Sequence, residues 1–261
     1  MEISIPLLIL IVILTFLGAY IDNAFGQGYG MLSPTMIILG FEPVVVVPVL
    51  LLSQMSSGFA GSIFHSIFEN VDLDSKDERD VKVTALFTIS GMIGMTGAVL
   101  LAVNIPDIII SSYIGVMIMI IGIIMLKDFG FKFSWKKLYA IGGFASFNKA
   151  LSGGGYGAIT TAGQVMSGRS HDEAVATSVF SEAFLSGYGF LLYFIFNGGL
   201  PQFDIMIQLL IITIISSIIA TPLGALTANR LEKKKAKKII GYLSVILGII
   251  SIMRIIILSL I

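Results

Sequence analysis

The chain has 261 residues, of which 56% are hydrophobic and only 12% charged, with 16 basic and 16 acidic side chains. Its mean hydropathy of +0.97 lies far outside the range of soluble globular proteins. It contains no cysteine, which excludes disulfides and thiolate metal sites. The composition predicts an all-α integral membrane protein of the cell membrane, surrounded by lipid bilayer and with no nucleic-acid partner, metal or cofactor.

Seven apolar segments approach the roughly 20 residues that a helix needs to cross a bilayer. They are residues 3–21, 43–64, 81–103, 106–126, 174–196, 205–226 and 239–260. Only Met1 and Glu2 precede the first segment, which therefore lacks the positively charged start of a signal peptide. We expect this first segment to be retained as a membrane helix.

Two glycine-rich stretches with matching sequences lie outside these segments. "DNAFGQGYGMLSP" (22–34) aligns with "KALSGGGYGAITT" (149–161) at an offset of 127 residues. The same offset, within two residues, also places Gly97-Ala98 over Gly224-Ala225, and Gly115 with Gly122 over Gly241 with Gly248. A constant offset along the chain predicts an internal duplication, with residues 1–126 and 138–261 as the two repeats and 127–137 as a linker.

The basic residues predict how the repeats are oriented. Lys and Arg gather in 76–82, 127–137 and 230–238, which places these loops in the cytoplasm, whereas the loops near 104–107 and 197–204 lack positive charge and are expected outside. Loops that the duplication makes equivalent then lie on opposite faces of the membrane. We therefore expect two inverted repeats, each a glycine-tipped broken-helix hairpin plus three transmembrane helices, with both termini external.

The segments beside the second glycine stretch are short. Residues 138–149 and 158–167 each span about half a membrane at 1.5 Å per residue, so we expect two half-helices that turn near the midplane. The first hairpin would have Gly26–Gly30 at its tip. Because 3–21 is longer than its counterpart, a full helix followed by a half-helix is an open alternative there.

The two tips predict an anion site. Non-helical backbone at membrane depth is tolerated where it lines a polar cavity, and helix N-termini that start there present free amides and a positive dipole end. Nearby hydroxyls and Lys149 add donors and charge. The candidate substrate-binding residues are Gly28, Tyr29, Gly30, Ser33, Lys149, Ser152, Gly155, Tyr156, Gly157, Thr160, Thr161 and Gln164. The alternative is close helix packing, the role expected of the glycines in 91–98 and 142–146.

Ionisable residues at membrane depth are further candidates. Lys149 and Asp22 occupy equivalent positions, so they could pair with each other across the repeats or serve the substrate. Glu182 lies deep in its helix and is, with Asp22, a candidate for proton coupling; a hydrogen-bonded structural carboxyl is the alternative. Arg169, His171 and His65 are interpreted as interfacial residues at helix ends.

At the tips the chain resembles the TauE/SafE family of membrane transporters, which repeats a glycine-rich turn followed by small and hydroxyl residues. The two copies read "GQGYGMLSPTMIILGFEP" (26–43) and "GGGYGAITTAGQVMSGRSHDEAVATS" (153–178). Gln27 and Thr161 depart from the family pattern, where glycine and proline are common. The resemblance implies the export of sulfite, sulfoacetate or a related sulfonate.

These observations predict a secondary transporter of a small sulfur-containing oxyanion, with alternating access around a midplane site and protons as a candidate coupling ion. A passive anion channel is the alternative. An intramembrane enzyme is not expected, because two histidines and no cysteine provide no nucleophile with its base at depth. The oligomeric state stays open, a homodimer included.

Overall fold

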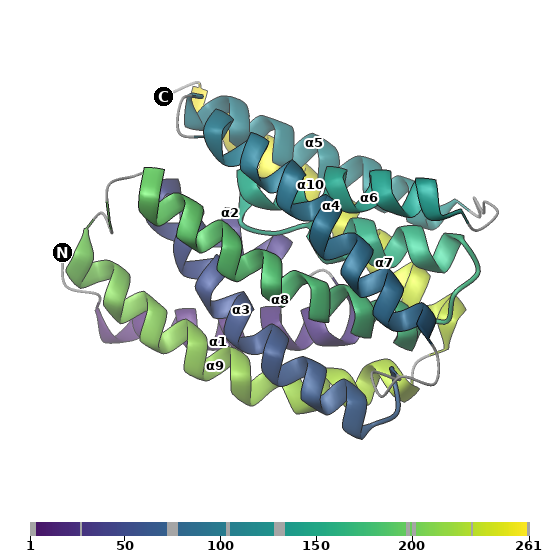
Figure 1. The fold of residues 1–261 in the computed structure, drawn as a ribbon. Helices are drawn as coiled ribbons and strands as arrows, with labels where there is room; N and C mark the ends of the chain where they lie inside the picture. The colour runs from purple at the N-terminus through teal and green to yellow at the C-terminus, as the bar shows by residue number, and fades with distance from the viewer. Residues whose placement is uncertain are drawn as a thin grey trace.

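The computed structural model describes residues 4–26, 28–71, 78–102, 105–127, 134–196, 199, 202–230 and 232–259. This part of the chain folds into ten helices and no strand (Figure 1). They are α1 (Ile5–Phe25), α2 (Tyr29–Ile38), α3 (Pro43–Ile67), α4 (Glu78–Ala102), α5 (Asp107–Leu126), α6 (Trp135–Ser152), α7 (Tyr156–Met166), α8 (His171–Phe196), α9 (Phe203–Arg230) and α10 (Lys233–Ser259). The prediction of an all-α protein is confirmed.

The long helices have the length and polarity of membrane spans. Within the described residues, α1, α3, α4, α8 and α9 are long and apolar enough to cross a bilayer. α1 presents an outward stripe at helical spacing, in which Ile5, Ile9 and Ile13 are at least half exposed. The interior instead buries many Ser, Thr, Asn and charged side chains. An apolar exterior around a polar interior is typical of membrane proteins that handle polar solutes or ions in their interior.

The neighbour relations between the helices are reciprocal. α1 packs along α9, and α6, its counterpart in the second repeat, packs along α4, the counterpart of α9 (Figure 1). In the same way α3 contacts α9 and α8 contacts α4, while the equivalent pairs α3 with α8 and α5 with α10 contact each other. This pattern is the one expected if a two-fold axis relates two five-helix units.

Glycine contacts give the relative directions of the equivalent helices. A Cβ added at Gly122 of α5 would lie 2.8 Å from the Gly241 carbonyl oxygen of α10, and one at Gly248 would lie 2.8 Å from that of Gly115. Early α5 therefore meets late α10, so the two helices are antiparallel. α3 and α8 are antiparallel too, because Gly58 lies against Ala183 whereas the earlier Met55 lies against the later Gly187.

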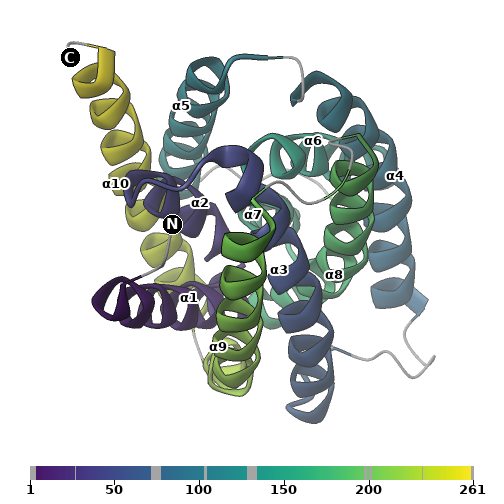
Figure 2. The same ribbon diagram turned by 90° about the vertical axis from the view of Figure 1, so that its left-hand side faces the viewer.

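α5 and α10 form a layer of their own beside the other helices (Figures 1 and 2). An apolar groove of about 380 Å³ separates α5 from α6 and α7, with Tyr113, Ile141 and Ile159 among its lining residues. On the other side of α6, Gly91, Gly94 and Gly142 have the predicted packing role, whereas Gly97 contacts nothing within 4 Å of its added Cβ. There, a Cβ added at Gly94 of α4 would lie 2.1 Å from the carbonyl oxygen of Gly143.

Each repeat begins with a long helix followed by a short one. α2 and α7 have 10 and 11 residues, about half a membrane, as expected. α6 has 18 residues, so the prediction of a half-helix over 138–149 is wrong. The apolar stretch underestimates this helix because α6 begins at Trp135, before that stretch, and continues through polar Lys149 and Ser152 to Gly153. Both hairpins therefore pair a near-full-length helix with a half-length one.

Candidate functional site

The two hairpin tips share one backbone device. α1 ends at Gly26 and α6 ends at Gly153, and both glycines are left-handed, with φ of 76° and 73°. Each donates its amide to the carbonyl four residues earlier at 2.7 Å, Gly26 to Asp22 and Gly153 to Lys149. Side chains with a Cβ rarely adopt this conformation, so glycine is required where each long helix stops.

The tips are in direct contact with each other. A Cβ added at Gly157 would lie 2.1 Å from the carbonyl oxygen of Gly26, and one at Gly154 would lie 2.5 Å from the amide nitrogen of Gly30. Gly155 also lies close to Gly30. The two backbones therefore meet without intervening side chains. The expected polar cavity between the tips is closed in this conformation, and the N-terminal ends of α2 and α7 lie against the opposite tip.

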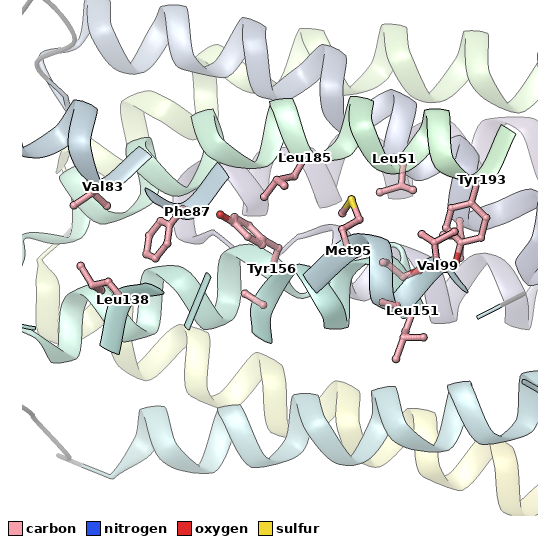
Figure 3. Close-up of a cluster of buried hydrophobic side chains, with 14 residues drawn as sticks. Leu51, Val83, Phe87, Met95, Val99, Leu138, Leu151, Tyr156, Leu185 and Tyr193 are labelled. Atoms are coloured by element: carbon pink, nitrogen blue, oxygen red, sulfur yellow. Dashed lines mark hydrogen bonds between the residues drawn. The ribbon is translucent and has the colours of Figure 1, made fainter. Parts of the chain in front are cut away.

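A tyrosine anchors each tip to the long helix that follows it. The Tyr29 hydroxyl lies 3.1 Å from Ser53 Oγ and 3.0 Å from Ser57 Oγ of α3, and the Tyr156 hydroxyl lies 2.8 Å from Ser181 Oγ of α8. Figure 3 shows the Tyr156 ring within the buried hydrophobic cluster, next to Phe87. These two predicted binding residues thus have fully buried side chains that hold the tips in place.

Beside the tips lies a buried charged network. Lys149 Nζ, at the end of α6, donates to Glu182 Oε1 of α8 at 2.8 Å, and it also donates to Gln54 Oε1 of α3. The Gln54 amide nitrogen in turn donates to Glu182 Oε1 at 2.6 Å. The three side chains are 0%, 2% and 1% exposed. A buried ion pair with a hydrogen-bonded amide inside a membrane protein is a candidate functional region.

Asp22 joins the same network from the first tip. Its Oδ2 accepts a hydrogen bond from Gln54 Nε2 at 3.4 Å, and its Oδ1 lies 3.5 Å from the Tyr29 amide. The carboxylate therefore sits at the N-terminus of α2, where the helix dipole favours a negative charge. Asp22 and Lys149 are brought into one network, as one alternative proposed, with Gln54 between them and with Glu182 as the ion-pair partner of the lysine.

Three buried polar atoms around the tips lack a hydrogen-bond partner in the described structure. They are Ser33 Oγ, Thr161 Oγ1 and Glu182 Oε2. Ser33 of α2 lies near Gly153 of the second tip, and Thr161 of α7 lies against Gly26 of the first. Each left-handed glycine thus faces an unsatisfied hydroxyl from the opposite hairpin. Buried polar groups without partners are rare, and a bound water or a ligand would satisfy them.

The remaining predicted site residues are used locally or elsewhere. The Ser152 hydroxyl donates within the second tip, to the Asn148 and Gly154 carbonyls, and the Thr160 hydroxyl bonds back to the Tyr156 carbonyl. Gln164 lies in a separate cluster at the far end of α7. There its amide nitrogen donates to the Ala174 carbonyl at 3.1 Å and to Ser178 Oγ at 3.0 Å. The structure does not bring Gln164 to the tips.

Arg169 forms the centre of that separate cluster. It forms an ion pair with Asp80 at the start of α4, approaches Glu173 at 3.4 Å, and donates to Gln164 Oε1 at 2.8 Å. Arg169, His171 and His65 lie at helix ends, as interpreted, but their side chains are buried inside the protein. Polar partners inside the fold, including the Ala24 carbonyl 2.8 Å from His171 Nε2, replace the water that a helix-end charge would use.

The contact of Glu42, which lies 127 residues before Arg169, is far weaker. Glu42, at the end of the first hairpin, is exposed and accepts a single hydrogen bond of 2.8 Å from Gln202 in the loop before α9. Among the described residues, no three His, Asp or Glu side chains come together as metal ligands.

Gln54 is the central residue that sequence reasoning missed. A lone amide in an apolar helix carries little signal by itself. Its position 128 residues before Glu182, within the offset of the duplication, was the available clue. The predicted duplication would relate the network residues as two pairs, Asp22 with Lys149 and Gln54 with Glu182.

Comparisons with known proteins agree with this architecture. The family model described as "Sulfite exporter TauE/SafE" matches residues 10–250. A curated relative, "Probable membrane transporter protein YtnM" of Bacillus subtilis (strain 168), is 27% identical over 71% of this chain. The match covers 64% of that relative, less than two thirds of its length. No solved structure matches. The family model covers nearly the whole chain, which therefore belongs to the TauE/SafE sulfite exporter family of membrane transporters.

Proposed function

We propose that this protein is a secondary transporter that moves a small sulfur-containing oxyanion, sulfite or an organosulfonate, by alternating access. The observation that carries the proposal is the meeting of two glycine tips, each starting a half-length helix, beside the buried Asp22, Gln54, Lys149 and Glu182 network. The family supplies the class of substrate. Export is the direction that the family name implies.

The substrate would bind where the tips now touch. The first-turn amides of α2 and α7, at Gly28–Gly30 and Gly155–Gly157, have no intrahelical acceptor and would donate to the oxyanion. Ser33 and Thr161 would complete their hydrogen bonding on it, and Lys149 would supply the positive charge. The second tip is favoured over the first, because the Asp22 carboxylate already occupies the end of α2.

Two oppositely oriented repeats would provide the alternation. A two-fold axis along the helices keeps equivalent helices parallel, whereas an axis in the membrane plane reverses them. The antiparallel packing of α3 with α8 and of α5 with α10 supports the second arrangement. We propose 1–126 and 138–261 as these repeats.

The orientation follows from the basic residues. The two chain ends lie on one side of Figure 1, and the end of α9 and the start of α4, which adjoin basic stretches, lie on the other. We propose that the basic side is cytoplasmic and that both termini are external.

A carrier fits the tip geometry better than a channel does. A passive anion channel needs an open wet path past both tips, but the Gly26 and Gly157 backbones are in contact. In a carrier, each tip would retract in turn and expose the site to one side of the membrane.

The proposal is tested in liposomes that contain the purified protein. Saturable counterflow of ³⁵S-sulfite, competed by sulfoacetate or taurine but not by chloride, is the expected result. Flux that stays proportional to concentration would indicate a channel. A thermal-shift screen of sulfite, sulfoacetate, taurine, thiosulfate and sulfate identifies the preferred substrate. The Lys149→Ala variant is the control that should lose the shift.

A further inference from the structure

We infer that the anion is carried together with a proton held on Glu182, so that the protein works as a proton–anion symporter. This inference rests on the proposed function: the coupling ion is a proton, and it crosses the membrane in the same direction as the anion.

The charges of the buried network do not balance. Among the described residues it contains two carboxyls, Asp22 and Glu182, and a single cation, Lys149. With all three ionised, its net charge is −1, and a bound anion would add to this excess. Uncompensated charge inside a protein costs several kcal/mol per ion. An anion is therefore accepted into this network only when a positive charge arrives with it.

No other helix around Glu182 supplies that charge. The charged residues of α4 and α9 lie at their ends, outside the membrane core. α3 faces Glu182 with the neutral amide of Gln54. The tyrosines of α2 and α7 direct their hydroxyls to serines. Asp22 of α1 adds only negative charge. The missing positive charge must come from solution, and a proton is the cation that a carboxylate takes up directly.

Glu182 has an atom ready for the proton. Its Oε1 accepts from both Lys149 and Gln54, whereas its Oε2 is buried and has no hydrogen-bond partner among the described residues. A proton that adds to Oε2 forms an O–H bond, and no other bond breaks. The side chain becomes neutral and gains a donor. Its hold on Lys149 weakens, and the ammonium group becomes available to the anion at the neighbouring tip.

The sign of the coupling follows from electrostatics. Antiport requires that proton and substrate exclude each other, which is natural when both are cations competing for one carboxylate. A proton and an anion have opposite charges, so each strengthens the binding of the other at close range. Both therefore occupy the same state of the carrier and cross together. On the far side, loss of the anion returns Lys149 to Glu182, and the proton leaves to water.

The test uses ³⁵S-methanesulfonate, because sulfonates stay ionised at every working pH and do not cross lipid as a neutral acid. Liposomes with acid outside should accumulate the label about tenfold for each pH unit of gradient, the limit for one proton per monoanion. Because the pair is neutral, an imposed membrane potential should not change this accumulation. Accumulation driven by acid on the opposite side, or no response to the gradient, would overturn the inference.

Transport itself is tested separately from proton coupling. Sulfite and methanesulfonate counterflow is measured without a pH gradient, and its absence for both anions would contradict transport itself. Counterflow without gradient-driven accumulation overturns only the coupling. Glu182→Gln, which mimics the neutral form, should keep counterflow and lose accumulation. Glu42→Gln, which neutralises an exposed carboxyl outside the network, is the control and should keep both.

A second measurement does not depend on any variant. Adding methanesulfonate to the protein in weakly buffered detergent with a pH dye should cause proton uptake that saturates with the bound anion. Proton release, or binding without a pH change, would exclude the protonated Glu182 complex.

Discussion

The two hairpin tips have nearly the same backbone and opposite charge. Gly26 and Gly153 end their helices with φ within a few degrees of each other and with the same 2.7 Å capping hydrogen bond. The residue that supplies the capped carbonyl is Asp22 in the first tip and Lys149 in the second. The backbone geometry is nearly the same at the two tips, while the charge of the residue at the capped position is opposite.

This difference assigns unequal roles to the tips. The first fills the N-terminus of its short helix with its own carboxylate, whereas the second has a cation and no such internal anion. A similar inequality exists at the two ends of the molecule, where Arg169 forms a buried ion pair with Asp80, whereas Glu42, 127 residues before Arg169, forms an exposed hydrogen bond with Gln202. Substitutions made in pairs, one at each tip or one at each end, test both differences.

The largest effect is expected from Lys149→Ala. Removal of one partner of a buried ion pair costs about 3–5 kcal/mol, because the other charge stays buried without compensation. We expect a large drop in the unfolding temperature and no measurable counterflow. Asp22→Ala, at the equivalent position, should destabilise the protein less, because Asp22 makes only longer hydrogen bonds.

A double variant separates folding from transport at this position. Lys149→Met with Glu182→Leu replaces the buried pair by apolar groups, which is often neutral or stabilising. The unfolding temperature should recover while counterflow stays absent. Recovery of both would show that the second tip does not need its positive charge.

The ends of the molecule are compared by Arg169→Gln and Glu42→Gln. Arg169 is buried and paired with Asp80, so its loss should cost about 3 kcal/mol or more of unfolding free energy. Glu42 is exposed, so its change should stay within about 0.5 kcal/mol. Chemical denaturation in detergent measures both values. Equal effects on the unfolding free energy would contradict the difference between the buried ion pair of Arg169 and the exposed hydrogen bond of Glu42.

The contact between the tips is probed by Gly157→Ala. The added Cβ would overlap the Gly26 carbonyl, and overpacking of this kind costs about 1–3 kcal/mol. Gly97→Ala is the control, because its Cβ would meet no atom within 4 Å and alanine favours a helix by about 1 kcal/mol. A Gly157→Ala protein as stable as the control would mean that the tips do not press on each other.

Sequence periodicity and length predicted most of the fold but little of the polar network. Long apolar runs identify α3 and α9 because the bilayer imposes their length, and the glycine repeat identifies both tips because only glycine suits the left-handed turn. α6 was underestimated because Lys149 and Ser152 are helical although they are polar. Apolar content reports the contact with lipid, whereas the hydrogen bonds of the backbone decide where a helix ends.

The partners of buried side chains depend on how helices that are far apart in the sequence pack together. A single sequence does not state which of these helices are in contact. Glu182 was identified as a buried carboxyl, but Gln54 became visible only when α3 and α8 were placed together. Arg169 looked like a helix-end charge because its neighbours in sequence are polar. Its burial depends on Asp80, which lies 89 residues away.

Smaller effects than those at the charged tip are expected at the tyrosine anchors, whose substitution compares the tips without changing a charge. Tyr29→Phe removes contacts with two serines, and Tyr156→Phe removes a contact with one. Each net hydrogen bond contributes about 0.5–1.5 kcal/mol, so Tyr29→Phe should lower the unfolding free energy more than Tyr156→Phe. Ser181 would be left without the tyrosine but can still donate to the Ser178 carbonyl at 2.9 Å, which limits the loss at the second tip. Thermal unfolding of both variants, with substrate present and absent, measures the difference. A larger loss of unfolding free energy in Tyr156→Phe than in Tyr29→Phe would contradict this prediction. It would mean that the tyrosine hydroxyl stabilises the second tip more than the first.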